Sequence, residues 1–211
     1  MQARDALKTR LFQYAPLLQS FPKWIILNPN ASEMLPLRRW ALASYADLAQ
    51  LLLQDDEVVL LITGAASEKP EAQALIRGVA HERMLDLTGF TSLEELPILY
   101  TLCIALITND SGPAHFAAPT EITTFVFFGP ETPTLYGALN PQAHFFYKGL
   151  ACSPCVSAAN HRKTACNDNQ CLRQISVAEV YDHVSTVLNL HSEPRSTDRG
   201  RASGECRIGI Q

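Results

Sequence analysis

Short apolar runs alternate with segments of helical spacing along most of the chain, and this alternation limits the fold more than any other feature. The runs lie at residues 24–28, 57–63, 83–89, 103–110, 123–129 and 144–148. Strands that are apolar on both faces and separated by helices indicate βαβ units with right-handed crossovers. The pattern therefore predicts an α/β fold built on a doubly wound, mainly parallel sheet with helices on both faces.

Helical spacing and composition divide the chain into three parts. Leucines recur at helical spacing in residues 1–22, which predicts an N-terminal helix that ends near Phe21-Pro22. Residues 23–191 hold all the apolar runs and include a cysteine-rich loop at 152–171. Residues 192–211 are polar and rich in Gly, Ser and Arg, which predicts a disordered tail.

Charge and hydropathy exclude several classes of partner and location. A net charge of −4 and the lack of any Lys/Arg run argue against a nucleic-acid partner. No run reaches the roughly 18–20 apolar residues that span a bilayer. Arg4, Asp5 and Lys8 lie where a signal peptide would need its apolar core. We therefore expect a cytoplasmic protein.

The turn after the 103–110 run carries the residues best suited to bind a ligand. Asp110, Ser111, Gly112 and Pro113 join a strand to a helix that also carries His115. In a doubly wound sheet, ligands bind at the carboxyl ends of the strands, and free N–H groups at a helix start attract phosphate. Gly112 would permit close approach to the backbone. The alternative is that Asp110 or Ser111 only caps the helix, which contributes about 1 kcal/mol.

Longer stretches resemble one enzyme family. The segments NDSGPAHFAA, FVFFGPETPTLYG, CSPC and CLRQISVAEV follow one another as in the C-terminal half of glycosyltransferase family 9, the ADP-heptose:lipopolysaccharide heptosyltransferases and their relatives. Upstream, ILNPNAS, RRWALASYADLA, LLITGAASE and LDLTGFTSLEELPIL are similar to motifs of the same family. The resemblance covers residues 24 to about 190 and implies the C-terminal, donor-binding domain of a GT-B enzyme, whose two Rossmann-like domains flank a cleft.

The resemblance also implies roles for individual residues. Asp110, Ser111 and Gly112 would hold the diphosphate and sugar of a nucleoside-diphosphate sugar, with His115 close by. The helix start and Arg38 would stabilise the leaving diphosphate electrostatically as the glycosidic bond breaks.

Four further positions are expected to contact the donor. By the same resemblance, Arg38 would meet the phosphates, Glu68 would accept hydrogen bonds from the ribose, Ser32 would add a polar contact and Thr91 would lie near the base. The alternatives are that Arg38 is a solvated loop charge and that Glu68 is an acid favoured by the helix dipole.

The sequence departs from the family pattern in ways that bear on catalysis. Glu121 and Thr123 replace a usual Gly and Pro, and Trp40-Ala41 replaces a Trp-Pro. Complete enzymes of the family also have an N-terminal domain that binds the acceptor and supplies the general base. Here the donor-domain pattern begins directly after residues 1–22, so we expect that domain to be missing from this chain and assign no catalytic residue.

Four cysteines form a candidate metal site. Cys152, Cys155, Cys166 and Cys171 have the spacing C-x2-C-x10-C-x4-C, which suggests a structural zinc or iron–sulfur site. Free thiols, or disulfides in an exported protein, are the alternatives. The resemblance implies that the transfer chemistry itself needs no cofactor.

These observations predict a heptosyltransferase-type glycosyltransferase that binds an ADP-heptose-like donor for transfer to a lipopolysaccharide or other surface glycan. A separate chain with the N-terminal domain, or self-association, would complete the cleft, and a peripheral position at the inner face of the membrane would suit the acceptor. The main alternative is a truncated, non-catalytic module that binds nucleotide or a partner. A dehydrogenase or epimerase is disfavoured because NPNAS, not G-x-G-x-x-G, follows the first apolar run. A metal-organised interaction domain is the third alternative.

Overall fold

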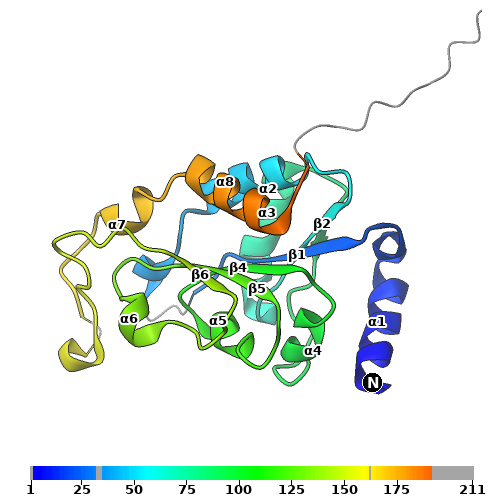
Figure 1. Ribbon diagram of the computed structural model, residues 1–211, viewed down its shortest axis with the longest axis horizontal. Helices are drawn as coiled ribbons and strands as arrows, with labels where there is room; N and C mark the ends of the chain where they lie inside the picture. The colour runs from blue at the N-terminus through cyan, green and yellow to red at the C-terminus, as the bar shows by residue number, and fades with distance from the viewer. Residues whose placement is uncertain (1, 32–34, 162, 192–211) are drawn as a thin grey trace, which may run out of the picture.

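The computed structural model describes residues 2–31, 35–161 and 163–191, so Ser32 and the predicted tail lie outside the described residues. A six-stranded parallel sheet with the order β3-β2-β1-β4-β5-β6 forms its centre (Figure 1). The strands are β1 (Lys23–Asn28), β2 (Val58–Ile62), β3 (Met84–Asp86), β4 (Ala105–Asn109), β5 (Thr123–Phe127) and β6 (Ala143–Phe146). From β1 the chain adds strands in one direction and from β4 in the other, which confirms the predicted doubly wound sheet.

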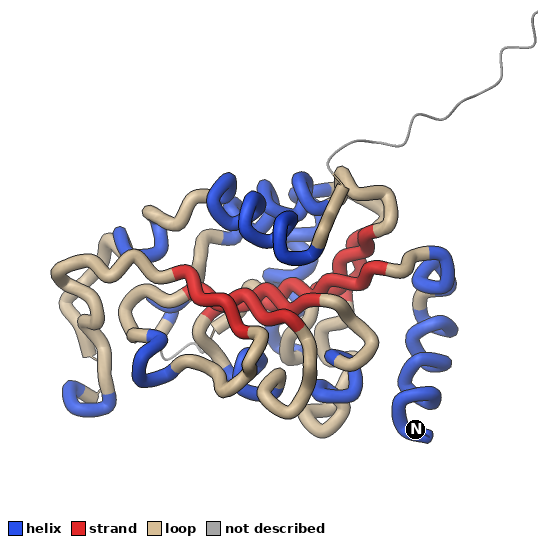
Figure 2. The backbone as a smooth tube through the Cα atoms, viewed as in Figure 1, coloured by secondary structure: helices blue, strands red, loops and turns tan. Residues whose placement is uncertain are grey.

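The central strands are largely apolar because they are buried on both faces. Along β1, Ile25 and Leu27 face one apolar layer, whereas Trp24 and Ile26 face the other. Helices cover both faces (Figures 1 and 2). The first layer contains α2 (Leu42–Leu52), α3 (Lys69–Val79) and α8 (Val177–Leu188). The opposite face carries α1 (Gln2–Tyr14), α4 (Leu96–Tyr100), α5 (Gly112–Phe116) and α6 (Pro133–Tyr136).

The first helix is shorter than the predicted one. The α-helix α1 ends at Tyr14, and a 3-10 helix, η1 (Pro16–Ser20), follows it. The residue before a proline is disfavoured in the helical conformation, and Ala15 accordingly has φ −138° and ψ 86°. The leucines at helical spacing therefore lie on two consecutive short helices.

Two other elements are shorter than the apolar pattern suggests. β3 ends at Asp86 because its carboxylate accepts hydrogen bonds from the backbone and the hydroxyl of Thr88, which turns the chain. α4 begins only at Leu96, after a turn in which the Glu95 carboxylate accepts from Ser92 N and Ser92 Oγ accepts from Glu95 N. Across the described ranges, no helix combines the length and apolar character of a membrane span.

Candidate functional site

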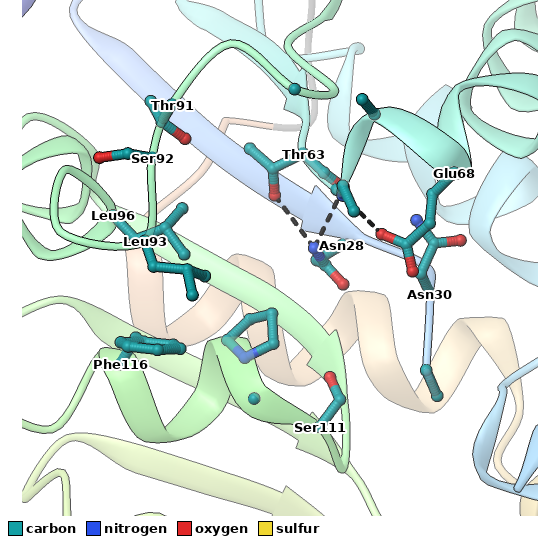
Figure 3. Close-up of a pocket in the computed structure, with 17 residues that line it drawn as sticks. Asn28, Asn30, Thr63, Glu68, Thr91, Ser92, Leu93, Leu96, Ser111 and Phe116 are labelled. Atoms are coloured by element: carbon teal, nitrogen blue, oxygen red, sulfur yellow. Dashed lines mark hydrogen bonds between the residues drawn. The ribbon is translucent and has the colours of Figure 1, made fainter. Parts of the chain in front are cut away.

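A pocket of about 560 Å³ opens at the carboxyl ends of β1, β2 and β4. It is lined by the loops that follow these strands and by the segment after β3 (Figure 3). β1 and β4 are neighbours in the sheet but continue in opposite directions, so the pocket lies at the topological switch point. This is where doubly wound sheets bind their ligands.

One wall of the pocket is polar. Asn28, the last residue of β1, donates from Nδ2 to Thr63 O at 3.0 Å. Asn30 is 5% exposed, and its Nδ2 has no hydrogen-bond partner among the described residues although it lines the pocket. Glu68 Oε2 accepts from Ala65 N at 2.7 Å, which orients its carboxylate. The wall thus presents a buried amide donor beside an oriented carboxylate.

Gly64 allows this polar wall to form. A Cβ atom at this position would lie 2.7 Å from Glu68 Oε2 and 2.9 Å from Asn30 Nδ2. Both contacts are far shorter than van der Waals distance. The absence of a side chain at residue 64 therefore lets both polar groups lie close to the Gly64 backbone.

The opposite wall is apolar. Leu93, Leu96 and Phe116 line it, with Thr91 near its edge (Figure 3). Leu93 is 65% exposed, and Phe116 is 36% exposed, so both present apolar surface to an incoming ligand. A pocket with one hydrogen-bonding wall and one apolar wall suits a ligand that combines a flat ring with polar groups, such as a nucleoside.

The start of α5 forms the floor of the pocket. Ser111 is the N-cap residue, but its side chain makes no capping hydrogen bond and donates instead to Asn109 O at 3.2 Å. A Cβ atom on Gly112 would have Phe116 Cε2, 3.9 Å away, as its nearest neighbour. The backbone of Gly112 is therefore open to a ligand, and the interpretation of Ser111 as a side-chain cap is wrong.

A buried ion cluster lies directly behind this floor. Arg38 Nη1 lies 3.2 Å from Glu131 Oε2 and 3.8 Å from Asp110 Oδ2. Asp110 is 4% exposed and Glu131 only 1%. The loop that carries Arg38 is tied to this place because Trp40 N donates to Asn109 Oδ1 at 2.8 Å. Arg38 is therefore a buried, ion-paired residue, and the alternative of a solvated loop charge is wrong.

The structure brings some of the predicted residues together and separates others. Ser111, Gly112, Glu68 and Thr91 line one pocket. Arg38 and Asp110 lie in the ion cluster beside it. His115 is exposed on α5 and is not among the lining residues, and Ser32 lies outside the described residues.

Sequence reasoning missed several residues of the site. These are Asn28, Asn30, Thr63 and Glu131. The signal for the asparagines was the abrupt polarity at the end of an apolar run, in ILNPN. Glu131, a single acid between two proline-containing turns in FGPETP, carried a weaker signal.

The four cysteines are free thiols in the structure. Cys152 and Cys166 are exposed, whereas Cys171 is buried. Burial raises the pKa of the Cys171 thiol, and the neighbouring Cys155 and Cys166 raise it further. Four thiols would suit zinc or iron, but within the described ranges no three Cys, His, Asp or Glu side chains are placed to hold a metal ion. The predicted site is therefore not formed in this arrangement of the loop.

Fold and site together define a Rossmann-like domain, a doubly wound parallel sheet with a pocket at its switch point, and glycosyltransferases of known structure share this fold. The chain matches Glycosyltransferase family 9 (heptosyltransferase) over residues 2–165, and it belongs to that family. The resemblance noted in the sequence motifs is thereby confirmed.

Known relatives agree with this assignment. Lipooligosaccharide heptosyltransferase 2 of Campylobacter jejuni is 28% identical over 181 residues, which are 84% of this chain and 54% of the relative. The Escherichia coli ADP-heptose lps heptosyltransferase II has a TM-score of 0.66 and 24% identity, over 81% of this chain and 47% of that one. A family 9 glycosyl transferase from Veillonella parvula has a TM-score of 0.70 and 20% identity, over 90% of this chain and 52% of that one. The chain thus spans about half the length of the relatives it matches.

Proposed function

We propose that this chain is the donor-binding half of a heptosyltransferase-type enzyme and that its pocket binds a nucleoside-diphosphate sugar of the ADP-heptose kind. The observation that carries the proposal is the pocket at the switch point. There the open Gly112 backbone faces the same space as the buried Asn30 Nδ2, which has no hydrogen-bond partner among the described residues. Membership of glycosyltransferase family 9 supports this choice of ligand.

In this proposal each wall binds a different part of the donor. The backbone at Ser111 and Gly112 meets the diphosphate, since free N–H groups at a helix start attract phosphate. The Glu68 carboxylate, oriented by Ala65 N, accepts hydrogen bonds from the ribose. The apolar wall beside Thr91 packs against the base. The contribution to catalysis is electrostatic, because these groups stabilise the charge that develops on the leaving diphosphate.

The general base is assigned to a carboxylate outside this pocket. Among the described residues that line it, Glu68 is the one acid, and its carboxylate is already held by Ala65 N. We propose that a separate chain or a second copy supplies the acceptor site and the base, at the cytoplasmic face of the membrane where a lipopolysaccharide-type acceptor is available. Light scattering of the purified chain would measure self-association.

A matched pair of glycine variants tests the donor site. Gly112→Ala places a methyl group where the ligand would approach, yet meets no atom closer than 3.9 Å in the protein. Gly78→Ala makes the same change in α3, where a Cβ meets nothing within 4 Å. Thermal unfolding of each variant would be followed with ADP, GDP, UDP and NAD. A ligand at about 100 times its Kd stabilises the folded state by roughly 2.7 kcal/mol.

The expected result is a shift in Tm with one nucleoside diphosphate that Gly78→Ala retains and Gly112→Ala loses. A shift that survives in Gly112→Ala would place the ligand elsewhere, and no shift with any of the compounds would contradict the donor-site proposal. The alternative, a binding module without turnover, predicts the same binding but no release of the nucleoside diphosphate from its sugar when the acceptor and the complementary half are present.

We also propose that the loop at 152–171 can close on a structural metal ion. Cys152, Cys155, Cys166 and Cys171 supply four thiols at a spacing that resembles structural metal sites. Zinc and iron measured in the purified protein, with Cys171→Ser as the control, should show about one ion per chain that the variant loses. Wild-type protein that contains no zinc or iron and is no more stable than Cys171→Ser would contradict this proposal.

A further inference from the structure

Arg38, Asp110 and Glu131 form a buried cluster next to the pocket, and the role proposed for it rests on the proposed donor site. Arg38 is 9% exposed and sits between two carboxylates, closer to Glu131 (3.2 Å) than to Asp110 (3.8 Å). Its Nε has no hydrogen-bond partner among the described residues. The guanidinium thus has donor capacity that the cluster does not use.

The position of the cluster connects it to the pocket. Asp110 directly precedes Ser111 and Gly112, which line the pocket, whereas Arg38 itself is not a lining residue. Glu131 reaches Arg38 from the turn after β5, 93 residues further along the chain. Glu131 therefore pairs with the guanidinium from a loop that is remote in sequence.

Two carboxylates already compete for the Arg38 guanidinium. Glu131 lies 3.2 Å and Asp110 lies 3.8 Å from its Nη1, next to the start of α5 where the proposed site would hold a diphosphate. A diphosphate gains from Arg38 only if the guanidinium gives up part of its pairing with Glu131. Arginine pairs with phosphate in the same bidentate geometry as with carboxylate, so the two acceptors compete for one group.

We propose that Glu131 is a positioning residue that holds Arg38 in a competing ion pair, which the diphosphate has to displace. Glu131 then sets the affinity for the donor and lowers it for every ligand that carries phosphate. A residue that only stabilised the fold would instead support binding, so its loss would weaken the affinity for all ligands alike. When Glu131 is replaced, the affinity for the diphosphate should therefore rise if Glu131 is a positioning residue and fall if it only stabilises the fold.

The test compares Glu131→Gln with Glu121→Gln by calorimetric titration. Both variants remove one negative charge, but Glu121 is exposed and lies before β5, at the amino-terminal edge of the sheet. Each is titrated with whichever of ADP, GDP or UDP the wild-type chain binds most tightly and with the corresponding nucleoside. We expect Glu131→Gln to bind the diphosphate about tenfold more tightly and the nucleoside with unchanged Kd. Glu121→Gln should match the wild type for both ligands.

A second variant keeps the test decisive if Glu131→Gln folds poorly. Glu131→Asp retains the charge but lengthens the contact with Arg38, so a smaller gain, again confined to the diphosphate, is expected. Unchanged or weaker diphosphate binding in both folded variants, or an equal change for nucleoside and diphosphate, would overturn the role of Glu131 while leaving the donor site intact. If wild type and variants bind none of the nucleotides, the donor site and the role of Glu131 both fail.

Discussion

At the scale of single residues, Gly64 offers a way to change the pocket without changing the fold. In Gly64→Ala the new Cβ would lie 2.7 Å from Glu68 Oε2 and 2.9 Å from Asn30 Nδ2, and both atoms end flexible side chains. We expect these side chains to move, which removes the bond from Ala65 N to Glu68 and costs about 1 kcal/mol of stability. The affinity for the nucleoside diphosphate should fall about tenfold, because both polar groups leave their positions.

Calorimetric titration and thermal unfolding of Gly64→Ala, with Gly78→Ala alongside, would separate the two effects. A Kd equal to that of the wild type would show that the Glu68–Asn30 wall takes no part in binding. A loss of stability well above that of one hydrogen bond would show that the backbone, not the side chains, has to move.

The sequence could predict only those site residues whose position follows from strand ends. Ser111, Gly112 and Glu68 each follow a buried apolar run, and parallel strands bring their carboxyl ends to one edge. Arg38 was expected to meet the phosphates, but its nearest acid is Glu131, which is remote in sequence. Arg38 and Glu131 lie in two irregular loops, and neither periodicity nor a local motif encodes a pairing between such loops. This ion pair therefore could not be predicted from the sequence.

At the scale of secondary-structure elements, Asp55 joins three of them at the amino-terminal edge of the sheet. Its carboxylate accepts from Lys23 Nζ at the start of β1, from Glu57 N before β2 and from His191 N after α8. Burial works to raise the pKa of Asp55, but these hydrogen bonds outweigh it and hold the pKa below its usual value. The ionised carboxylate therefore stabilises the folded state.

We expect Asp55→Asn to lower the free energy of unfolding by about 1–3 kcal/mol at neutral pH, the range for hydrogen bonds to a charged group. A lowered pKa in the folded state contributes stability that is present above the unfolded value of about 3.9 and is lost as the pH falls through the folded value. The difference between wild type and variant should thus shrink below about pH 4.

Denaturant unfolding from pH 3 to pH 7 measures this difference, and Asp56→Asn is the matched control. The Asp56 side chain is 61% exposed and its nearest cation, Arg83, is 3.8 Å away, so its loss should be close to neutral at every pH. A destabilisation by Asp55→Asn that stays constant down to pH 3 would mean that packing, not charge, holds the three elements together.

The strands and the start of α5 were predicted more closely than the start of α4, for a physical reason. A strand buried on both faces needs an unbroken apolar run, as in β2, where every residue is buried. α4 and α5, of five residues each, are too short for a periodic pattern, and local turns set their first residues. The point where a helix begins depends on such hydrogen bonds more than on hydropathy.

At the scale of the whole molecule, both apolar layers share the same strands, so we expect them to unfold together. The chain has two tryptophans, and each lies in a different layer. Trp24 packs against Phe12 of α1, with ring centroids 6.0 Å apart, whereas Trp40 stacks on Phe127 at 4.4 Å. Because side chains of β1 alternate between the layers, the loss of either layer exposes apolar surface of the other.

Two single-tryptophan variants would test whether the two layers unfold together. Trp40→Phe leaves Trp24 to report on the layer of α1, and Trp24→Phe leaves Trp40 to report on the layer of α2 and α8. In each variant the fluorescence and far-UV circular dichroism transitions in urea should coincide, the mark of an all-or-none transition. The comparison is made within one variant, so the stability lost with either ring does not affect it. A fluorescence midpoint in Trp40→Phe well below the dichroism midpoint would show that the α1 layer opens first, which would make α1 a separable element instead of part of one folded unit.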